Sequence, residues 1–270
     1  MSSIDRREFM KLTAAAAAAD LLLRHWETGT RIARLPDALR PQTRAEGYAI
    51  QAQWLRQTRA PLFGWKIAAT SVAGQRHINV DGPLAGRLLA ETVVEDGATV
   101  SLVGGLMRVI EVELSFRFDK DIAPRVGPYS VEEVMANVGT LHPAIEIPDS
   151  RYEDFCAVGA PQLIADNACA HRFMLGGAVA APWRDADLAA HAVSAEVVGK
   201  SRHEGKGANA LGDPRIALAW IVNELSGIGV PIAAGEVVTT GTCVTPVPVE
   251  PGDVVRARYG EFGELTVRLA

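Results

Sequence analysis

The chain has 270 residues, of which 48% are hydrophobic and 22% are charged, so it can bury a sizeable core and is not globally disordered. Its formal net charge is -5 and its lysines and arginines are scattered, which excludes the basic face of a nucleic-acid-binding protein. No apolar run approaches the roughly 18 residues that span a bilayer, so we expect no membrane partner.

The N-terminal segment admits two interpretations. Arg6 and Arg7 precede an alanine-rich stretch, 14–19, in the manner of a twin-arginine export signal. Asp20 interrupts that stretch, and no clean cleavage site with a polar linker follows. We therefore favour an alanine-rich amphipathic helix that continues through Trp26. This places the protein in the cytoplasm, with twin-arginine export as the minor alternative.

The cysteines also indicate a reducing compartment. Cys156, Cys169 and Cys243 include no C-x-x-C pair, and their number is odd. The sequence therefore predicts neither a disulfide framework nor a zinc site. We expect these side chains to be small, buried and apolar in character.

Helices are predicted from caps and apolar spacing. A second helix is predicted over 43–56, with Thr43 as its cap. Ser130 and Glu133 form the capping box of a short helix over 130–138. A longer helix is predicted to begin at Asp213-Pro214, where Asp is the cap and Pro fits the first turn.

Strands dominate from residue 64 onward. The segment 110–118 alternates apolar and polar residues, which predicts a strand with one buried face and one functional or hydrated face. The other predicted strands lie at 64–67, in two short runs within 92–100, and at 141–147, 236–240, 254–259 and 265–269. Because these strands do not alternate regularly with helices, we expect an α+β fold rather than a doubly wound parallel sheet.

Three glutamates could form a metal site. Glu111 and Glu113 lie two apart in one predicted strand, so they project from the same face and repel each other unless a cation or proton neutralises them. Glu146 lies between Ile145 and Ile147 in another strand-like segment, which suggests a semi-buried cleft. Three carboxylates without His or Cys suit Mg²⁺ or Mn²⁺. By spacing alone, a solvated strand face fits Glu111 and Glu113 as well.

Short motifs along nearly the whole chain favour the metal site. They are 64–67 (GWKI) with Thr70-Ser71, 80–83 (VDGP) with Gly86, 111–116 (EVELSF), 143–147 (PAIEI), 149–151 (DSR), Asp166-Asn167-Ala168, 207–214 (GANALGDP) with Ala219-Trp220, 234–238 (AGEVV), 240–242 (TGT) and 251–253 (PGD). In their order and spacing, from about residue 20 to the C-terminus, the chain resembles the 2-keto-4-pentenoate (2-hydroxypentadienoate) hydratase and 4-oxalocrotonate decarboxylase group of the fumarylacetoacetate hydrolase superfamily.

The resemblance implies roles for named residues. Glu111, Glu113 and Glu146 would hold the divalent cation, and Lys66 and Asp81 would be the catalytic acid or base. Lys66 lies on an otherwise apolar strand, where a lysine needs a partner or must reach the surface. Asp81 also suits its turn for purely local reasons.

Other positions are less specific. Thr242 would bind substrate through its hydroxyl, although a plain turn residue fits equally well. Asp166-Asn167 marks a conformationally special loop without an assigned role. Relatives often continue with serines after this motif, whereas this chain has Cys169, Ala170 and His171, so the substrate contacts there stay open. His142 and His171 are expected to be structural.

For the whole chain, the resemblance implies a mixed β-sandwich or roll of the fumarylacetoacetate hydrolase C-terminal type. We expect a small helical N-terminal region over residues 1–62 and the catalytic domain over 63–270. The family also implies a homo-oligomer and admits a pathway partner enzyme.

The implied activity is that of a hydratase in aromatic-compound catabolism. A 2-hydroxy-2,4-dienoate would be protonated on carbon to a conjugated 2-keto acid, and water would then add to give a 4-hydroxy-2-keto acid. A 4-oxalocrotonate-type decarboxylase is the alternative, because loss of carbon dioxide yields the same enolate. A carbon–carbon hydrolase fits the motifs less well. A catalytically silent scaffold subunit is the alternative of another class, and the intact Glu111, Glu113, Glu146, Lys66 and Asp81 argue against it.

Overall fold

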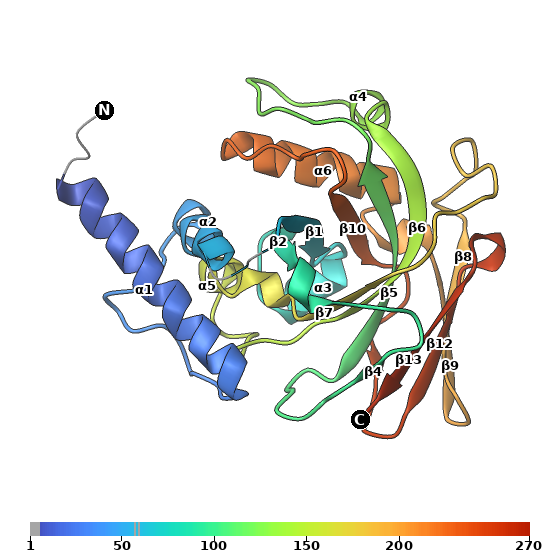
Figure 1. Cartoon of the computed structure of the whole chain (residues 1–270), viewed down its shortest axis with the longest axis horizontal. Helices are drawn as coiled ribbons and strands as arrows, with labels where there is room; N and C mark the ends of the chain where they lie inside the picture. Colours follow the sequence, from blue (N-terminus) through green and yellow to red (C-terminus); the bar gives the residue numbers. More distant parts are fainter. Residues whose placement is uncertain (1–5, 57, 59) are drawn as a thin grey trace.

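A computed structural model describes residues 6–56, 58 and 60–270, with side chains described from Met10 onward (Figure 1). The α-helices are α1 (Arg6–Thr28), α2 (Arg44–Gln51), α3 (Val72–His77), α4 (Val131–Met135), α5 (Ala160–Ala165) and α6 (Pro214–Gly227). Short 3-10 helices cover Ala52–Arg56, Ala90–Thr92, Asn167–Cys169, Gly207–Asn209 and Gly260–Phe262. None of the helices in the described residues is long and apolar enough to cross a membrane.

The strands form two sheets. The larger has the order β2-β1-β10-β5-β6-β7-β3, with β11 paired to β5, and the smaller has the order β4-β13-β12-β8-β9. The strands are β1 (Leu62–Ala68), β2 (Leu84–Leu89), β3 (Val93–Val94), β4 (Thr99–Val100), β5 (Val109–Phe118), β6 (Val138–Ile147), β7 (Arg172–Leu175), β8 (Ala192–Val197), β9 (Ser201–Lys206), β10 (Val237–Thr242), β11 (Val247–Pro248), β12 (Val254–Arg258) and β13 (Glu264–Leu269).

The pairing of the strands confirms the α+β prediction. Strands that follow one another, such as β5 and β6, β8 and β9, and β12 and β13, pair antiparallel. The parallel pairs, β1 with β10, β3 with β7 and β4 with β13, join strands that are distant in sequence. The sheets are therefore mixed rather than doubly wound.

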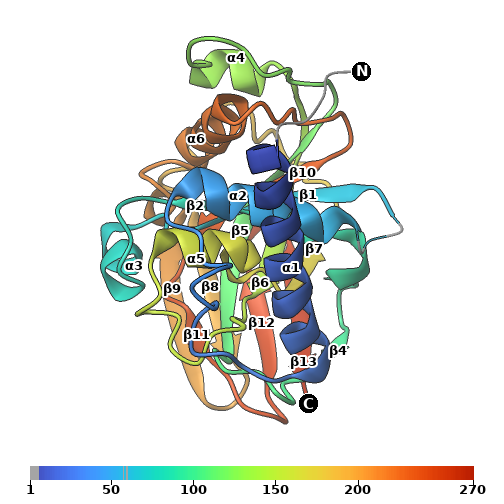
Figure 2. The same ribbon diagram turned by 90° about the vertical axis from the view of Figure 1, so that its left-hand side faces the viewer.

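Among the described residues, three hydrophobic clusters hold these layers together, and two of them are large. In Figure 1 the larger sheet lies between α1 on one side and β8, β9, β12 and β13 on the other, and α6 lies against β10. The main core joins both sheets with α6 through residues such as Phe116, Val255 and Leu218. A smaller core joins α1 and the end of α2 to the body through Leu22, Trp54 and neighbouring side chains. Figure 2 shows α1 in front of α2 and α5.

The helix predictions hold where caps determine them. The predicted N-terminal helix is α1, with Ala18 and Leu22 fully buried, although the side chains of Arg6 and Arg7 lie outside the described part. Thr43 caps α2 by accepting a hydrogen bond from Glu46 N, and the predicted segment tightens into a 3-10 helix after Gln51. At α6, Asp213 accepts from Arg215 N as the predicted cap.

One prediction from local pattern needs correction. The capping box of Ser130 and Glu133 is present, but α4 ends at Met135 because Val138 already begins β6. The polar face of β5 is mixed, since Glu111 is partly exposed whereas Glu113 and Ser115 are fully buried.

Two of the three cysteines are buried as predicted. All three are free, and Cys169 and Cys243 are buried, whereas Cys156 is only half-buried.

A buried ionic network fixes the turn that follows β6. Arg151 forms an ion pair with Asp166, and both side chains are inaccessible to solvent. Arg151 Nη1 also donates to the carbonyl oxygens of Asp149 at 2.9 Å and Ala170 at 3.1 Å, and Ser150 Oγ donates to Asp166 Oδ2 at 2.7 Å. The network joins the loop after β6 to the end of α5.

We expect Asp166→Asn to lower the free energy of unfolding by about 3–5 kcal/mol, because Arg151 would keep its buried charge without a counter-ion. Urea denaturation measures this loss. Glu250→Gln is the control, since the ion pair of Glu250 with Lys200 is solvent-exposed and its removal should cost less than about 1 kcal/mol. Equal losses in the two variants would contradict a role for the buried pair.

Candidate metal centre

Three carboxylates meet on one face of the larger sheet. The register of β5 and β6 places Glu111 directly opposite Glu146, and Glu113 is two residues along β5 on the same face. Each of the three offers a carboxylate oxygen, and these oxygens all lie within 4.8 Å of one another. Glu113 and Glu146 are fully buried, whereas Glu111 is partly exposed. The strand pairing therefore brings together the three predicted ligands.

Glu113 is oriented by β10. The Thr239 hydroxyl and the Gly241 backbone N–H both donate to Glu113 Oε2, the latter at 2.9 Å. Gly241 has φ +98°, and a Cβ there would lie 2.2 Å from Thr70 Oγ1. Only glycine fits this position, so the chain can bring an amide close to the carboxylate.

Lys66 reaches the carboxylates from β1. Its ammonium lies 3.0 Å from Glu146 Oε1 and donates to the carbonyl oxygen of Ala168 at 3.0 Å. Ala168 lies in the Asn167–Cys169 turn, where three consecutive residues have positive φ values of 54°, 50° and 63°. The predicted special loop is thus a left-handed turn that directs a carbonyl group toward Lys66.

Gly86 on β2 leaves room for this arrangement. A Cβ at this position would lie 2.9 Å from Lys66 Cδ and 2.5 Å from the Asn167 carbonyl oxygen. Any larger residue would therefore displace the lysine or the left-handed turn.

The electrostatics of the cluster are unbalanced without a further cation. If all groups ionise, three carboxylates and one ammonium leave two negative charges, which is the charge that a divalent cation neutralises. Burial, with the neighbouring Glu111, raises the pKa of Glu113 to about 7. Burial also raises the pKa of Glu146 well above its ordinary value, despite Lys66. For Lys66, burial lowers the pKa, but the carboxylates of Glu146 and Glu111 outweigh it and raise the pKa.

The donor atoms fit a metal. Glu113 Oε1 and Glu146 Oε2 are buried without a hydrogen-bond partner among the described residues, although buried carboxylate oxygens are normally paired. An all-oxygen set of carboxylates is the chemistry that hard cations such as Mg²⁺ and Ca²⁺ prefer. The cluster could therefore hold a divalent cation.

Glu111, the partly exposed member of the cluster, lies in a pocket with two branches, whereas Glu113 and Glu146 line neither branch. The apolar branch, of about 360 Å³, contains Lys66 and Glu111 and is walled by Ile78, Leu84, Leu106, Met107, Phe155 and Leu163. The hydroxyl branch, of about 600 Å³, contains Glu111 and is walled by Thr70, Ser71, Asn209, Thr242 and Thr245. Glu111 and His77 are among the residues that line both branches, so the branches adjoin there.

The other predicted site residues have different positions. Thr242 lines the hydroxyl branch, where its hydroxyl donates to the Val244 carbonyl at 2.7 Å. Asp81 does not line either branch. Its side chain is 81% exposed and lies 3.2 Å from Arg44 Nη1, so the structure does not bring it to the carboxylates, and its acid or base role stays a prediction.

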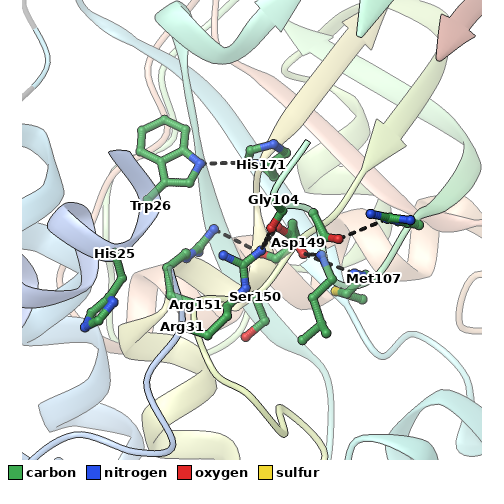
Figure 3. Close-up of polar contacts among 12 residues, drawn as sticks. His25, Trp26, Arg31, Gly104, Met107, Asp149, Ser150, Arg151 and His171 are labelled. Carbon is green, nitrogen blue, oxygen red and sulfur yellow. Dashed lines mark hydrogen bonds and ion pairs between the residues drawn. The ribbon is translucent and has the colours of Figure 1, made fainter. Parts of the chain in front are cut away.

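Both histidines considered from the sequence are hydrogen-bonded away from this pocket. His142 is close to Thr140 Oγ1 and the Gly176 carbonyl, each at 2.8 Å. His171 Nδ1 accepts from Trp26 Nε1 at 2.6 Å, and burial lowers the pKa of His171 to about 4 (Figure 3). These contacts agree with the structural role expected for lone histidines.

Several contributors to the site were missed by sequence reasoning. Thr239, the Gly241 amide and the Ala168 carbonyl orient the charged groups through contacts that are distant in sequence. Ser115 belongs to the motif of Glu111 and Glu113, and its buried hydroxyl has no hydrogen-bond partner among the described residues and lies on the face of Glu113. A hydroxyl two residues after Glu113 was the only local signal.

Comparison with known proteins identifies the family of this chain and several relatives. Residues 45–270 match the family described as fumarylacetoacetate (FAA) hydrolase C-terminal. Over 228 residues the chain is 35% identical to a 2-hydroxyhexa-2,4-dienoate hydratase from Comamonas testosteroni, covering 82% of this chain and 84% of the relative. Over 230 residues it is 34% identical to a 4-oxalocrotonate decarboxylase from Pseudomonas sp. (strain CF600), covering 84% and 85%.

A solved structure is similar over the full length. It is a 4-oxalocrotonate decarboxylase from Pseudomonas putida G7, complexed with magnesium and adipate. The TM-score is 0.85 at 28% identity, and the match covers 100% of both chains. The same decarboxylase complexed with calcium and acetate gives a TM-score of 0.84.

The raised pKa of Glu113 gives a pH dependence with a defined sign. Between its ordinary value of 4.5 and about 7, this carboxyl binds more protons in the folded than in the unfolded protein. Its contribution to the stability of the metal-free protein therefore falls as pH rises through that window. A bound cation replaces the proton and offsets this loss.

We therefore expect saturating Mg²⁺ or Mn²⁺ to raise the Tm by roughly 5 °C at about pH 8, and by clearly less at about pH 5.5. Differential scanning calorimetry with and without metal measures both shifts. A metal-induced shift that is equal at the two pH values, or absent at both, would contradict the assignment.

Proposed function

The chain belongs to the fumarylacetoacetate hydrolase C-terminal family, and on this premise we propose that it is a metal-dependent hydro-lyase of aromatic-compound catabolism. It adds water to a 2-hydroxy-2,4-dienoate of the 2-keto-4-pentenoate type and yields a 4-hydroxy-2-keto acid. The resemblance seen in the sequence motifs and the expected type of fold are confirmed by the family match and the full-length structural likeness. The observation that carries the proposed activity is the buried carboxylate cluster beside Lys66.

We assign the metal to Glu111, Glu113 and Glu146, and name Mg²⁺ or Mn²⁺ as the cation. The unpaired carboxylate oxygens of the cluster support this assignment, as do the magnesium and calcium complexes of the decarboxylase from Pseudomonas putida G7. A bound divalent cation would supply Lewis-acid polarisation of the substrate's carboxylate and adjacent oxygen.

We assign the proton transfer to Lys66 rather than Asp81. An ammonium group has three N–H donors, and two are directed at Glu146 and Ala168, which leaves one for the substrate. Lys66 lines the pocket, whereas Asp81 pairs with Arg44 outside it. Geometry comes before pKa when an acid is chosen, and it favours the lysine.

The reaction proceeds in two proton-balanced steps. Lys66 donates a proton to the far carbon of the dienol, and the proton of the enol hydroxyl returns to Lys66, which gives a conjugated 2-keto acid. The hydroxyl of water then adds to the distal carbon of the remaining double bond, and its proton adds to the carbon beside the ketone. Thr242, on the wall of the hydroxyl branch, is assigned to the substrate carboxylate, toward which its hydroxyl would turn from the Val244 carbonyl oxygen.

Experiments can distinguish two alternatives from the proposed hydratase. A 4-oxalocrotonate-type decarboxylase would use the same cluster, and relatives with both names match at similar identity. A catalytically silent scaffold subunit would not need three buried carboxylates and a buried lysine, whose burial costs stability.

We propose a cytoplasmic homo-oligomer that admits a pathway partner enzyme. The fully buried Ala18, Ala19 and Leu22 of α1 support the cytoplasmic location, since removal of this helix as an export signal would open the smaller core. A shortened N-terminus in protein isolated from its native host would contradict it, and sedimentation equilibrium measures the number of subunits.

We expect Glu113→Gln to lower the rate of metal-dependent hydration by at least about 100-fold without unfolding the protein. Mutation of a residue that only hydrogen-bonds to a metal ligand already lowers metal affinity or activity by about 10–100-fold, so loss of a ligand should cost at least as much. The assay follows loss of the ultraviolet band of 2-hydroxypentadienoate with Mg²⁺ or Mn²⁺. Glu264→Gln is the matched control, since Glu264 is exposed on β13.

The products distinguish a hydratase, a decarboxylase and a catalytically silent scaffold. A 4-hydroxy-2-keto acid indicates hydration, and carbon dioxide released from 4-oxalocrotonate indicates decarboxylation. A fully active Glu113→Gln variant would contradict the assignment of the metal ligands. Failure of both substrates with metal present would favour the scaffold.

A further inference from the structure

The two branches of the pocket differ in chemistry. The hydroxyl branch offers the side chains of Thr70, Ser71, Asn209, Thr242 and Thr245, which suit the polar end of a substrate. The apolar branch contains Lys66 and is walled by aliphatic and aromatic side chains from five separate segments of the chain. A ligand whose polar head lies at the carboxylate cluster therefore has one apolar direction for its tail.

Charge in the apolar branch disfavours an anionic tail. Among the described residues that line it, Lys66 and His77 are those that can carry positive charge. The Lys66 ammonium is already directed at Glu146 and Ala168. Glu153 and Asp154 add two acidic groups to the lining, and both are exposed at the surface. A second substrate carboxylate there would lose hydration without gaining a dedicated cation.

His77 is the one group that could compensate such a carboxylate. It lies at the end of α3, is exposed, and lines both branches. Its ring meets Phe155 edge-on at 6.1 Å, and its Nε2 lies 3.9 Å from Cys156 Sγ. Because His77 lies beside Phe155 of the wall, a His77→Ala variant is included in the experiment below.

Asp149 holds the loop that carries two of the wall residues. Asp149 Oδ1 accepts from the backbone N–H groups of Leu106 at 2.9 Å and Met107 at 3.1 Å. Arg31 pairs with Asp149 and donates to the Gly104 carbonyl at 2.6 Å, as Figure 3 shows. The buried Asp149 thus fixes the backbone from which Leu106 and Met107 contribute to the wall.

We propose that the apolar branch receives the tail of the substrate and selects an uncharged, alkyl-terminated monoacid over a diacid. This inference rests on the proposed function, because it takes the carboxylate cluster as the site of the substrate's 2-keto acid end. It assigns the chain to alkyl-substituted 2-hydroxydienoates, and it disfavours the diacid that a 4-oxalocrotonate-type decarboxylase requires.

Two unreactive acids of equal carbon number test the proposal. In 2-oxohexanoate the tail ends in a methyl group, and in 2-oxoadipate it ends in a carboxylate. With Mg²⁺ present, isothermal titration calorimetry on the full chain should give a Kd for 2-oxohexanoate at least about tenfold lower than for 2-oxoadipate.

Arginine substitutions test whether the apolar branch causes the preference for 2-oxohexanoate. Met107→Arg places a cation on the wall and should reduce the ratio of the two Kd values at least about tenfold. Leu106→Arg, at a position that is 43% exposed, is a second variant in case the first does not fold. Val103→Arg is the matched control, since Val103 lies on the same loop, is 88% exposed and lines neither branch, so the ratio should not change.

The outcomes are separable. Equal or tighter binding of 2-oxoadipate overturns the proposal, and loss of that binding in His77→Ala would identify His77 as the reason. An unchanged ratio in both arginine variants also overturns it. Preference for 2-oxohexanoate without hydration of any dienoate contradicts the proposed function and not the subsite. Hydration of a dienoate with preference for 2-oxoadipate contradicts the subsite and not the proposed function. Failure of both keto acids to bind contradicts both the subsite and the proposed function.

Discussion

The structure depends on keeping three carboxylates close together in a buried place with one ammonium among them. Like charges at this separation oppose folding, and burial strengthens their repulsion. The surrounding chain is arranged around that constraint. The register of β5 and β6 fixes the relative positions of the glutamates, Thr239 and the Gly241 amide orient one of them, and β1 brings Lys66. The two unpaired carboxylate oxygens give the cluster its capacity to bind a cation.

The sequence predicted the parts of the site that follow from local geometry. Glu111 and Glu113 had to share a face because they are two apart in a strand. Glu146 joined them only through the order of family motifs, because the register between β5 and β6 is set by contacts across the sheet. The groups that hold Lys66 and Glu113 include a carbonyl and an amide of the backbone, which leave no side-chain signature in a sequence.

The same division explains the fold predictions. The caps at Thr43, Ser130 and Asp213 are made within a few residues, so their sequence patterns identified the helix starts. Where α4 ends depends on the start of β6, which is set by its pairing with β5, and there the local pattern predicted too long a helix. Asp81 matches a motif of the family while its side chain pairs with Arg44, so its catalytic role stays a prediction.

The separation of the two cores has a consequence for how the protein comes apart. The smaller core meets the core of the sheets at α2, α5 and β2, which contribute to both, whereas α1 contributes to the smaller core and the carboxylate cluster belongs to the sheets. Local opening of α1 therefore does not require the strands to separate, and its amide protons should exchange with solvent sooner than those of β5 and β6. Trp26 and Trp54 report on the first event, whereas Trp65 and Trp183 report on the second. Tryptophan fluorescence of this chain thus records two different unfolding processes in a single signal.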